Sequence, residues 1–281
     1  MLLICCILLS LSGEGARRLT APANGHVGSW GSLEYGSAGA PGQVVGGRWR
    51  PLHYLYASAI FVDVLAACGA DGFCFVRNDG VAAWQGTVTA FVLEFGTGKR
   101  TAVGPGRAIA LPGGAGQLHR FCLGGGSPEA GGGCNELQAA VDGVVPGCFG
   151  GGGAVHCALE MHACPSTGGC SPTGAPPNLL LLGPPMSLAL PVATVNATVV
   201  GDGLHLPVTI TVAADALALF VVLTTAAQGR FSDNAFTLSP GQSRTLDWVP
   251  FSAVAGGTGP GSIEELRRTL RVEHLAENLV A

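Results

Sequence analysis

The chain has 281 residues, of which 48% are hydrophobic and only 11% are charged, and its formal net charge at pH 7 is −4. This balance lacks the basic surface that neutralises nucleic-acid phosphates and lacks a polybasic membrane anchor, so neither kind of partner is expected. Glycine (45) and proline (18) are abundant, but the apolar fraction is large enough to bury a core of one large or two ordinary domains.

The first segment has the length and composition of a signal peptide. Met1 to Ser12 is apolar, and Gly13-Glu14-Gly15 supplies a small-x-small cleavage pattern, so residues 1–15 are a possible signal peptide. The run is too short to span a bilayer, and we expect no other membrane insertion. Because Arg17 and Arg18 follow the apolar run instead of preceding it, a membrane anchor and an artefactual or truncated start remain alternatives. The favoured location is the secretory pathway, meaning secreted, lysosomal or vacuolar.

Residues 16–66 contain the first strongly periodic segment. Apolar side chains recur at helical spacing over Arg48 to Leu65, and Pro51 suits the first turn of a helix. The pattern predicts an amphipathic helix over residues 48–65, with Trp49 on its apolar stripe.

After this helix the sequence changes to short β-type runs separated by Gly, Pro, Asn and Asp, which is typical of antiparallel sandwiches. The expected strands are Phe73 to Arg77, Thr87 to Phe95, Arg107 to Leu111, Val155 to Met161, Val195 to Val200, Leu204 to Val212, Ala218 to Leu223 and Arg244 to Val249. We divide them into one sandwich at 67–190, with Gly/Cys-rich insertions, and a second at 191–281. In the second, Ser262 to Glu265 is a capping-box pattern for a short helix, and a final strand is expected within Thr269 to Leu275.

The cysteines outside the apolar start favour disulfides over free thiols. They are eight in number: Cys68, Cys74, Cys122, Cys134, Cys148, Cys157, Cys164 and Cys170. Their pairing stays open at this point, because eight cysteines allow many pairings. Zinc bound by His156, Cys157, His162 and Cys164 is the sharper alternative. Strand alternation would turn Cys157 away from His156 and His162, so the ligands could not converge without a bend, and we predict no metal site and no cofactor.

Two motifs resemble β-mannosidases. Ser29-Trp30-Gly31-Ser32-Leu33-Glu34-Tyr35-Gly36 and then Gly47-Arg48-Trp49-Arg50-Pro51-Leu52-His53-Tyr54 resemble the stretch that closes their catalytic barrel. Gly229-Arg230-Phe231-Ser232-Asp233-Asn234-Ala235-Phe236 resembles the signature of their C-terminal immunoglobulin-like domain. The residues that carry the resemblance, expected to be structural, are Trp30, Glu34, Tyr35, Trp49, His53, Tyr54, Arg230, Phe231, Ser232, Asp233, Asn234 and Phe236.

This resemblance implies a mainly β fold: two immunoglobulin-like antiparallel β-sandwiches preceded by one amphipathic helix left over from a (β/α)8 barrel. The family is exo-acting and retaining, and it removes terminal β-linked mannose with two barrel carboxylates. Such a barrel needs about 250 residues, so this chain would be the tail of the enzyme, with no catalytic residue of its own. Glu34 is the tempting nucleophile, but its flanks differ from the nucleophile motif. The apolar face of this orphan helix would either dock on the first sandwich or stay exposed and favour self-association.

A non-catalytic secreted β-sandwich that binds glycan or protein is the alternative function. Four further expectations concern single residues or short motifs. We expect His53 to be a packing residue, and Asp233 and Asn234 to hold an Asx turn instead of calcium. Asn196-Ala197-Thr198 is a possible glycosylation site if the chain is secreted, and contact of Trp84 with a sugar stays open.

Overall fold

The structure is a computed structural model that describes residues 34–35, 48–49, 51–59, 61–114, 116–126, 128, 133–134, 137–166, 177–201, 208–250 and 262–279. The described residues of Tyr56–Ala189 form one compact unit. Those of Leu190–Ala281, with the described residues before Tyr56, form the other. The expected class is confirmed: both units are built from antiparallel sheets, and a helix precedes them.

The N-terminal elements differ from the single long helix that the sequence predicts. Strands β1 (Glu34–Tyr35) and β2 (Arg48–Trp49) pair antiparallel, so Trp49 lies in a strand and not on a helical stripe. Helix α4 spans Pro51–Ala59, with proline at its first position as expected. The predicted helix over 48–65 is therefore too long at both ends. Its last part is strand β3 (Val64–Cys68), because these residues pair with the strand that follows.

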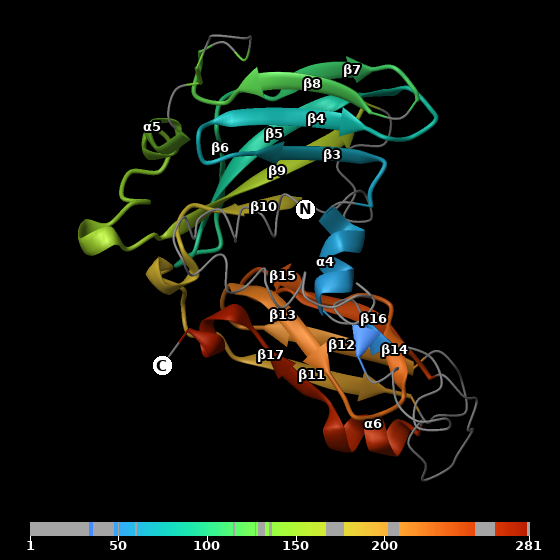
Figure 1. Cartoon of the computed structure of the whole chain (residues 1–281). Coiled ribbons are helices and arrows are strands. Elements are labelled where there is room, and N and C mark those ends of the chain that lie inside the picture. The colour runs from blue at the N-terminus through green and yellow to red at the C-terminus, as the bar shows by residue number, and fades with distance from the viewer. Residues whose placement is uncertain are drawn as a thin grey trace. The chain divides into compact units, whose positions relative to one another are not determined.

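The first unit is a two-layer sandwich (Figure 1). One sheet has the order β3-β4-β8, with β4 at Phe73–Asn78 and β8 at Gln117–Cys122. The other has the order β10-β9-β5-β6, with β7 also paired to β5; its strands are β5 (Trp84–Glu94), β6 (Arg100–Ala102), β7 (Arg107–Leu111), β9 (Cys157–Pro165) and β10 (Asn178–Leu181). The core between them takes Val76 and Phe121 from one sheet and Val88, Val92 and Leu159 from the other.

Short elements fill the Gly/Cys-rich insertions of this unit, where the sequence predicts no regular structure. They are helix α5 (Leu137–Asp142) and the 3₁₀ turn η1 (Gly151–Gly153). A further 3₁₀ turn, η2 (Pro185–Ser187), follows β10. Leu137 and Val141 on α5 are buried in the sandwich core. Burial of these two side chains holds the insertion onto the sandwich.

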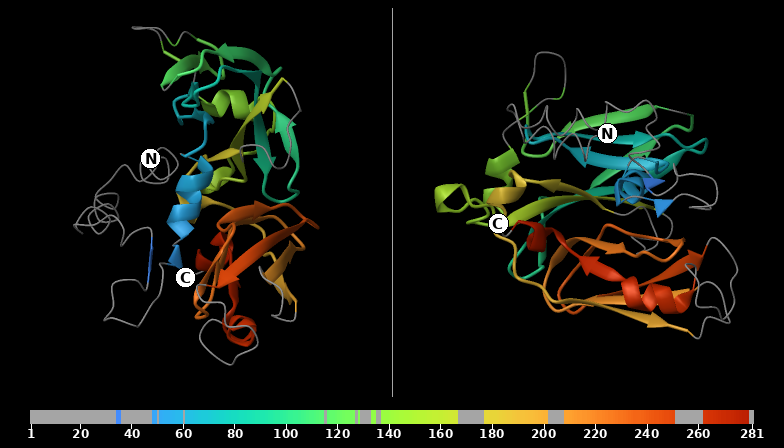
Figure 2. Two further views of the ribbon diagram at one scale, coloured as in Figure 1. Left: turned by 90° about the vertical axis from the view of Figure 1, so that its right-hand side faces the viewer. Right: turned by 60° about the horizontal axis from the view of Figure 1, so that its bottom comes forward.

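The second unit is also a sandwich of two sheets (Figure 2). One has the order β11-β12-β16-β14, with strands at Val195–Val200, Val208–Ala214, Ser243–Pro250 and Gly229–Phe231 in that order. The other has the order β15-β13-β17, with strands at Phe236–Leu238, Ala218–Thr224 and Arg271–Glu273. Trp248, Ile210 and Leu223 are fully buried between the sheets.

The end of the second unit follows the sequence pattern. Helix α6 (Ile263–Thr269) begins after Ser262, whose Oγ accepts a hydrogen bond from the N–H of Glu265 at 3.1 Å. The helix ends at Thr269, and the chain re-enters the sheet as β17 before a 3₁₀ turn, η3 (Leu275–Asn278). Both the capped short helix and the final strand are confirmed.

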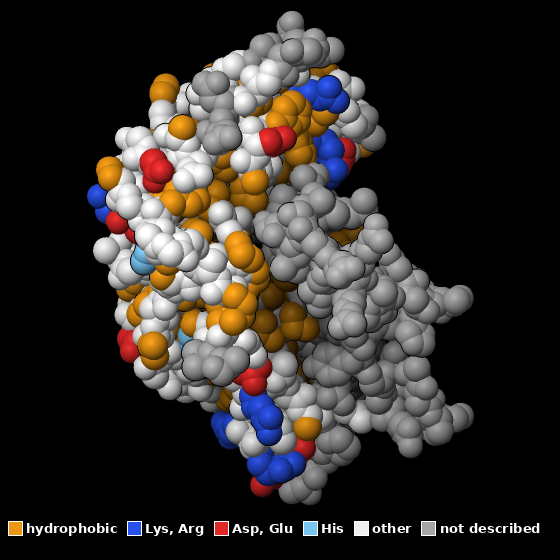
Figure 3. Space-filling model, turned by 60° about the vertical axis from the view of Figure 1, so that its left-hand side comes forward, with side chains coloured by type: hydrophobic (Ala, Val, Ile, Leu, Met, Phe, Trp, Pro, Cys, Tyr) orange, Lys and Arg blue, Asp and Glu red, His pale blue; other side chains and the backbone are white. Residues whose placement is uncertain are grey.

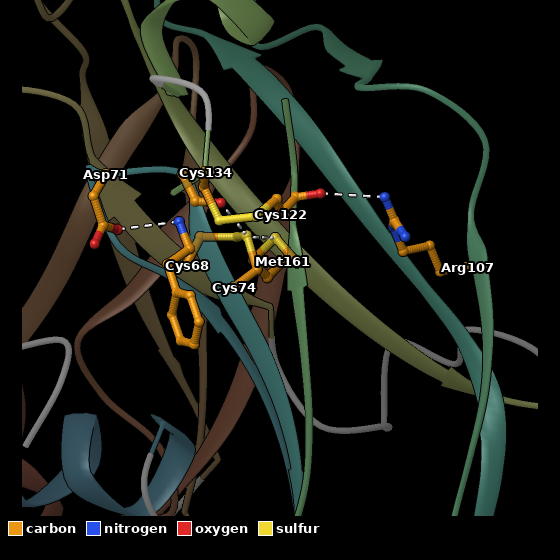
Figure 4. Close-up of a disulfide and its surroundings, with 9 residues drawn as sticks. Cys68, Asp71, Cys74, Arg107, Cys122, Cys134 and Met161 are labelled. Carbon is orange, nitrogen blue, oxygen red and sulfur yellow. Dashed lines mark hydrogen bonds between the residues drawn. A yellow bond between two sulfur atoms is a disulfide. The ribbon is translucent and has the colours of Figure 1, made fainter. Parts of the chain in front are cut away.

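Disulfides join cysteines that are close in sequence. The pairs are Cys68–Cys74, Cys122–Cys134 and Cys148–Cys157, separated by 6, 12 and 9 residues, and Cys164 is disulfide-bonded too. Figure 4 shows Cys68–Cys74 beside Met161 and near Cys122–Cys134, and the Cys68–Cys74 pair lies in the core of the sandwich. Cys170 lies outside the described residues. Oxidised cysteines in such number fit an extracellular or secretory-pathway protein.

The low charge of the sequence is visible on the molecular surface. Figure 3 shows one face on which uncharged atoms predominate over Lys, Arg, Asp and Glu. Within the described ranges, no helix is long and apolar enough to cross a membrane.

Candidate functional site

The signature of the second unit forms the end of β14, the start of β15 and the turn between them. Ser232 extends the pairing of β14 with β16: its N–H donates to the carbonyl of Asp247 at 2.7 Å, and its Oγ accepts from the N–H of Asp247 at 2.9 Å. Phe231 and Phe236 lie on either side of the turn, and both are buried in the core. Arg230 alternates outward and is exposed. The motif is therefore a structural corner of the sandwich.

Asn234 holds this corner together with its side chain. Its Oδ1 accepts hydrogen bonds from the N–H of Leu223 at 2.8 Å and from the N–H of Ala235 at 2.9 Å. Its Nδ2 donates to the carbonyl of Leu223 at 2.8 Å. The amide thus pairs with one residue of β13 as a neighbouring strand would. The Asn234 oxygen thus holds the turn through nearby backbone N–H groups, as the sequence pattern predicts.

Asp233 is partly buried on the other side of the corner. Its Oδ1 accepts from the N–H of Asn234 at 2.8 Å, and its Oδ2 forms an ion pair with Arg244 of β16. Burial raises the pKa of the Asp233 carboxyl, and the opposing effects of Arg244 and the Asn234 N–H do not offset it. Arg244 also lies over the ring of Phe236, 4.8 Å from its centroid.

We expect Asn234→Ala to lower the free energy of unfolding of the second unit by about 3 kcal/mol, because three buried backbone groups lose their partner and each costs about 1–3 kcal/mol. Asn234→Asp keeps the acceptor but loses the donor to Leu223, so a smaller loss is expected. Urea unfolding of the full chain measures both. Thr245→Ala, at an exposed position of β16, is the control. Equal stability of Asn234→Ala and this control would contradict the role of the amide.

Helix α4 joins the signature corner through Tyr54. The Tyr54 hydroxyl donates to the carbonyl of Phe231 at 2.9 Å, and the ring is 5% exposed within the core of the second unit. His53 is half-buried, its ring edge-on to Tyr54 with centroids 5.7 Å apart, which agrees with packing. Tyr54 and Phe231 belong to two separate sequence motifs, and the fold brings them together.

The remaining signature residues lie in the β1–β2 pair. Glu34 is opposite Trp49 in the register, and Tyr35 is opposite Arg48. Trp30 lies outside the described residues. The assignment of Glu34 as structural stays a prediction.

A second polar cluster lies on β9 and β6 of the first unit. Glu160 is 2% exposed, and its carboxylate accepts two hydrogen bonds from Arg100, from Nε at 2.7 Å and from Nη2 at 3.0 Å. The ring of His162 lies 3.1 Å from Glu160 Oε2. Sequence alternation puts Glu160 and His162 on one face, but Arg100 is 60 residues away in the chain, so the cluster could not be found from sequence.

The structure contradicts the alternative of a zinc site on β9. Cys157 and Cys164 are both disulfide-bonded, so neither offers a thiolate to a metal. Cys157 points into the core, and His162 lies on the opposite face beside Glu160, as the alternation predicts. His162 also packs edge-on to Phe91, with centroids 4.9 Å apart.

The Glu160 cluster makes the stability of the first unit depend on pH. Burial raises the pKa of the Glu160 carboxyl, but the hydrogen bonds from His162 and Arg100 outweigh burial, and the pKa lies below its ordinary value of 4.5. A lowered pKa contributes stability above that ordinary value, and the contribution is lost as the pH falls through the lower folded-state pKa. We expect the free energy of unfolding, measured with urea, to fall as the pH drops below 4.5. We expect Glu160→Gln to reduce the slope of this fall with pH. Equal slopes would contradict the pairing.

A cavity of about 320 Å³ lies in the first unit between β5, β8 and the turn before β7. Its walls include Val88, Ala90, Met161 and Phe121, with Arg107 as the charged member. The Arg107 guanidinium lies 5.0 Å from the centroid of Phe121 and donates to the carbonyl of Cys122 at 3.2 Å (Figure 4). Because Arg107 occupies a face of this ring, that face is not open for a sugar to stack on.

Trp84 is the tryptophan for which the sequence leaves contact with a sugar open. It is the first residue of β5 and packs against the core of the first unit, half-buried, beside Gly86. Its ring is therefore committed mainly to packing.

The second unit is similar to a known family of domains. Residues 190–278 match the family model Ig_mannosidase, described as an Ig-fold domain. The second unit therefore has an Ig fold and is similar to the Ig_mannosidase family. A search of curated protein sequences gave no match.

Solved structures similar to the chain include glycoside hydrolases. The β-D-mannosidase of Dictyoglomus thermophilum is 17% identical, with a TM-score of 0.49, over 80% of this chain and 23% of the mannosidase. The exo-chitosanase of Amycolatopsis orientalis is 14% identical, with a TM-score of 0.42, over 79% of this chain and 27% of that enzyme. A transglutaminase of red sea bream is 11% identical, with a TM-score of 0.21, over 67% and 27%. The chain thus spans about a quarter of the structures it matches.

Proposed function

We propose that this chain is the C-terminal accessory region of a β-mannosidase-like exo-glycosidase and is itself non-catalytic. The match of residues 190–278 to the Ig_mannosidase domain is the observation that carries the proposal. The full-length enzyme would hydrolyse terminal β-linked mannose, so its substrates would be β-mannoside-containing glycans. A retaining glycosidase of this kind needs an acid/base carboxyl and a nucleophilic carboxylate about 5–5.5 Å apart.

The role of the accessory region is mechanical support. The bond from Tyr54 to Phe231 and the burial of the Tyr54 ring attach helix α4 to the Ig_mannosidase domain. By its resemblance, α4 is the helix that ends the catalytic barrel, so this contact would fix the end of the barrel to the sandwich. Such support acts on stability and positioning and supplies no reacting group.

We further propose that the chain is a glycoprotein of the secretory pathway, either secreted, lysosomal or vacuolar. The disulfides Cys68–Cys74, Cys122–Cys134 and Cys148–Cys157 support an oxidising compartment.

Reading the transcript upstream of the Met1 codon tests the accessory role. We expect the open reading frame to continue into a (β/α)8 barrel with an Asn-Glu pair and a Ser-Glu-Tyr/Phe-Gly motif. An in-frame stop codon directly upstream of a translated Met1 would overturn this proposal and favour a stand-alone module that binds glycan or protein.

A further inference from the structure

Strand β11 lies at the edge of its sheet. It is first in the order β11-β12-β16-β14, and within the described part of the chain it pairs only with β12. Its sequence, Val-Asn-Ala-Thr-Val-Val, contains no charge, proline or glycine. Natural edge strands use charges, prolines or bulges to block pairing with another chain, and uncharged β-prone segments of this length tend to self-associate. This edge therefore needs another form of cover.

The same strand contains the sequon, and its acceptor side chain faces outward. Val195, Ala197 and Val199 pack against the core, whereas Asn196 and Thr198 are exposed on the opposite face. In the sequence, no other asparagine is followed two positions later by serine or threonine.

The surface around Asn196 leaves room for a sugar. The residue opposite Asn196 in the register is Ala213, which is small and exposed. The next positions across this face are also small: Thr211, Ser243 and Thr245. A bulky group on Nδ2 would extend over the outer face and the edge without displacing a large side chain.

We propose that Asn196 carries an N-linked oligosaccharide and that this oligosaccharide covers the edge of β11. The proposal rests on the secretory route proposed above. The donor is a lipid diphosphate-linked oligosaccharide. The Asn196 Nδ2 forms a bond to the anomeric carbon of the first sugar, and the bond from that carbon to the diphosphate oxygen breaks. Nδ2 loses one proton, and the lipid diphosphate is the leaving group.

Occupancy is tested by expressing the full chain behind a cleavable leader in a eukaryotic host. Secreted and cell-retained protein are both treated with a peptide-N-glycosidase in heavy-oxygen water, and the peptide that contains Asn196 is analysed by mass spectrometry. We expect conversion of Asn196 to labelled aspartate in the wild type and in Thr198→Ser, which keeps the sequon. Thr198→Ala should show no conversion.

The oxidation state of the cysteines distinguishes a chain that is not glycosylated at Asn196 from a chain that does not enter the secretory pathway. Unmodified Asn196 in chains whose Cys68–Cys74 disulfide has formed would overturn the glycosylation proposal and leave the secretory route intact. Chains with free thiols would overturn the secretory route, and the glycosylation proposal with it.

Two unglycosylated variants test the covering of the edge. Thr198→Ala removes the sugar and leaves the edge uncharged, so we expect self-association in size-exclusion chromatography. Thr198→Lys also removes the sugar but places a charge on the edge, so we expect it to remain monomeric as the glycosylated wild type does. A monomeric Thr198→Ala, or association that persists in Thr198→Lys, would show that the edge of β11 is not what the sugar covers.

Discussion

Gly229→Ala is expected to lower the free energy of unfolding of the Ig_mannosidase domain by at least about 3 kcal/mol. A Cβ at Gly229 would lie 2.4–2.5 Å from Cε2, Cζ2 and Nε1 of the Trp248 ring. Trp248 is 1% exposed, and its Nε1 has no hydrogen-bond partner within the described residues, so the ring is placed by packing alone. A ring enclosed on all sides has no free space into which it could move.

Urea unfolding of the full chain measures this loss, and Gly96→Ala is the matched control. A Cβ at Gly96 meets no atom within 4 Å, so its effect should stay within about 0.5 kcal/mol. Trp248→Leu in the Gly229→Ala background removes the clashing ring, and the two substitutions should be strongly non-additive in a double-mutant cycle. Additive effects would show that contact with Trp248 is not the reason for glycine at this position.

The second large effect is a missing activity. We expect the purified chain to hydrolyse aryl β-mannosides no faster than the buffer background. Glu160 and Asp233 are both paired with arginines, Arg100 and Arg244, so each carboxylate is committed to a structural ion pair. They also belong to different units, Glu160 to β9 and Asp233 to the corner after β14. A retaining glycosidase instead needs two carboxyl groups facing one substrate.

Strands whose apolar residues alternate locally could be predicted from sequence. Arg107–Leu111 and Val195–Val200 have the observed bounds, and Phe73–Asn78 differs from its prediction by one residue. In each, one face is more buried than the other, so the period of two is visible in the sequence. The short capped helix Ile263–Thr269 was also predictable, because its start signal is local.

The predicted helix over 48–65 is too long because the spacing of apolar residues does not show which segments pair as strands. Val64–Cys68 is apolar enough to continue a helix, but it forms β3, since it pairs with β4 and Cys68 is bonded to Cys74. β6 was missed because it has only three residues, all at least partly exposed. Such short strands are defined by their neighbours and carry little signal of their own.

The resemblance to β-mannosidases identifies the signature residues, but it does not identify the residues that they contact. The neighbours of Gly229 and Asn234 are Trp248 and Leu223, on strands β16 and β13. Ion pairs such as Arg100–Glu160 are likewise made between strands that are distant in sequence. Contacts of this kind follow from sheet order, which no local pattern contains.

The most direct test of the account is an assay of the intact chain on an activated aryl β-mannoside, with Glu34→Gln measured in parallel. Glu34 is the carboxylate whose surroundings come nearest to the nucleophile motif of the family, and it lies in β1 opposite Trp49. The account predicts background rates for both proteins. Hydrolysis by the intact chain that disappears in Glu34→Gln would contradict it, because Glu34 would then be catalytic and the chain would be more than an accessory region.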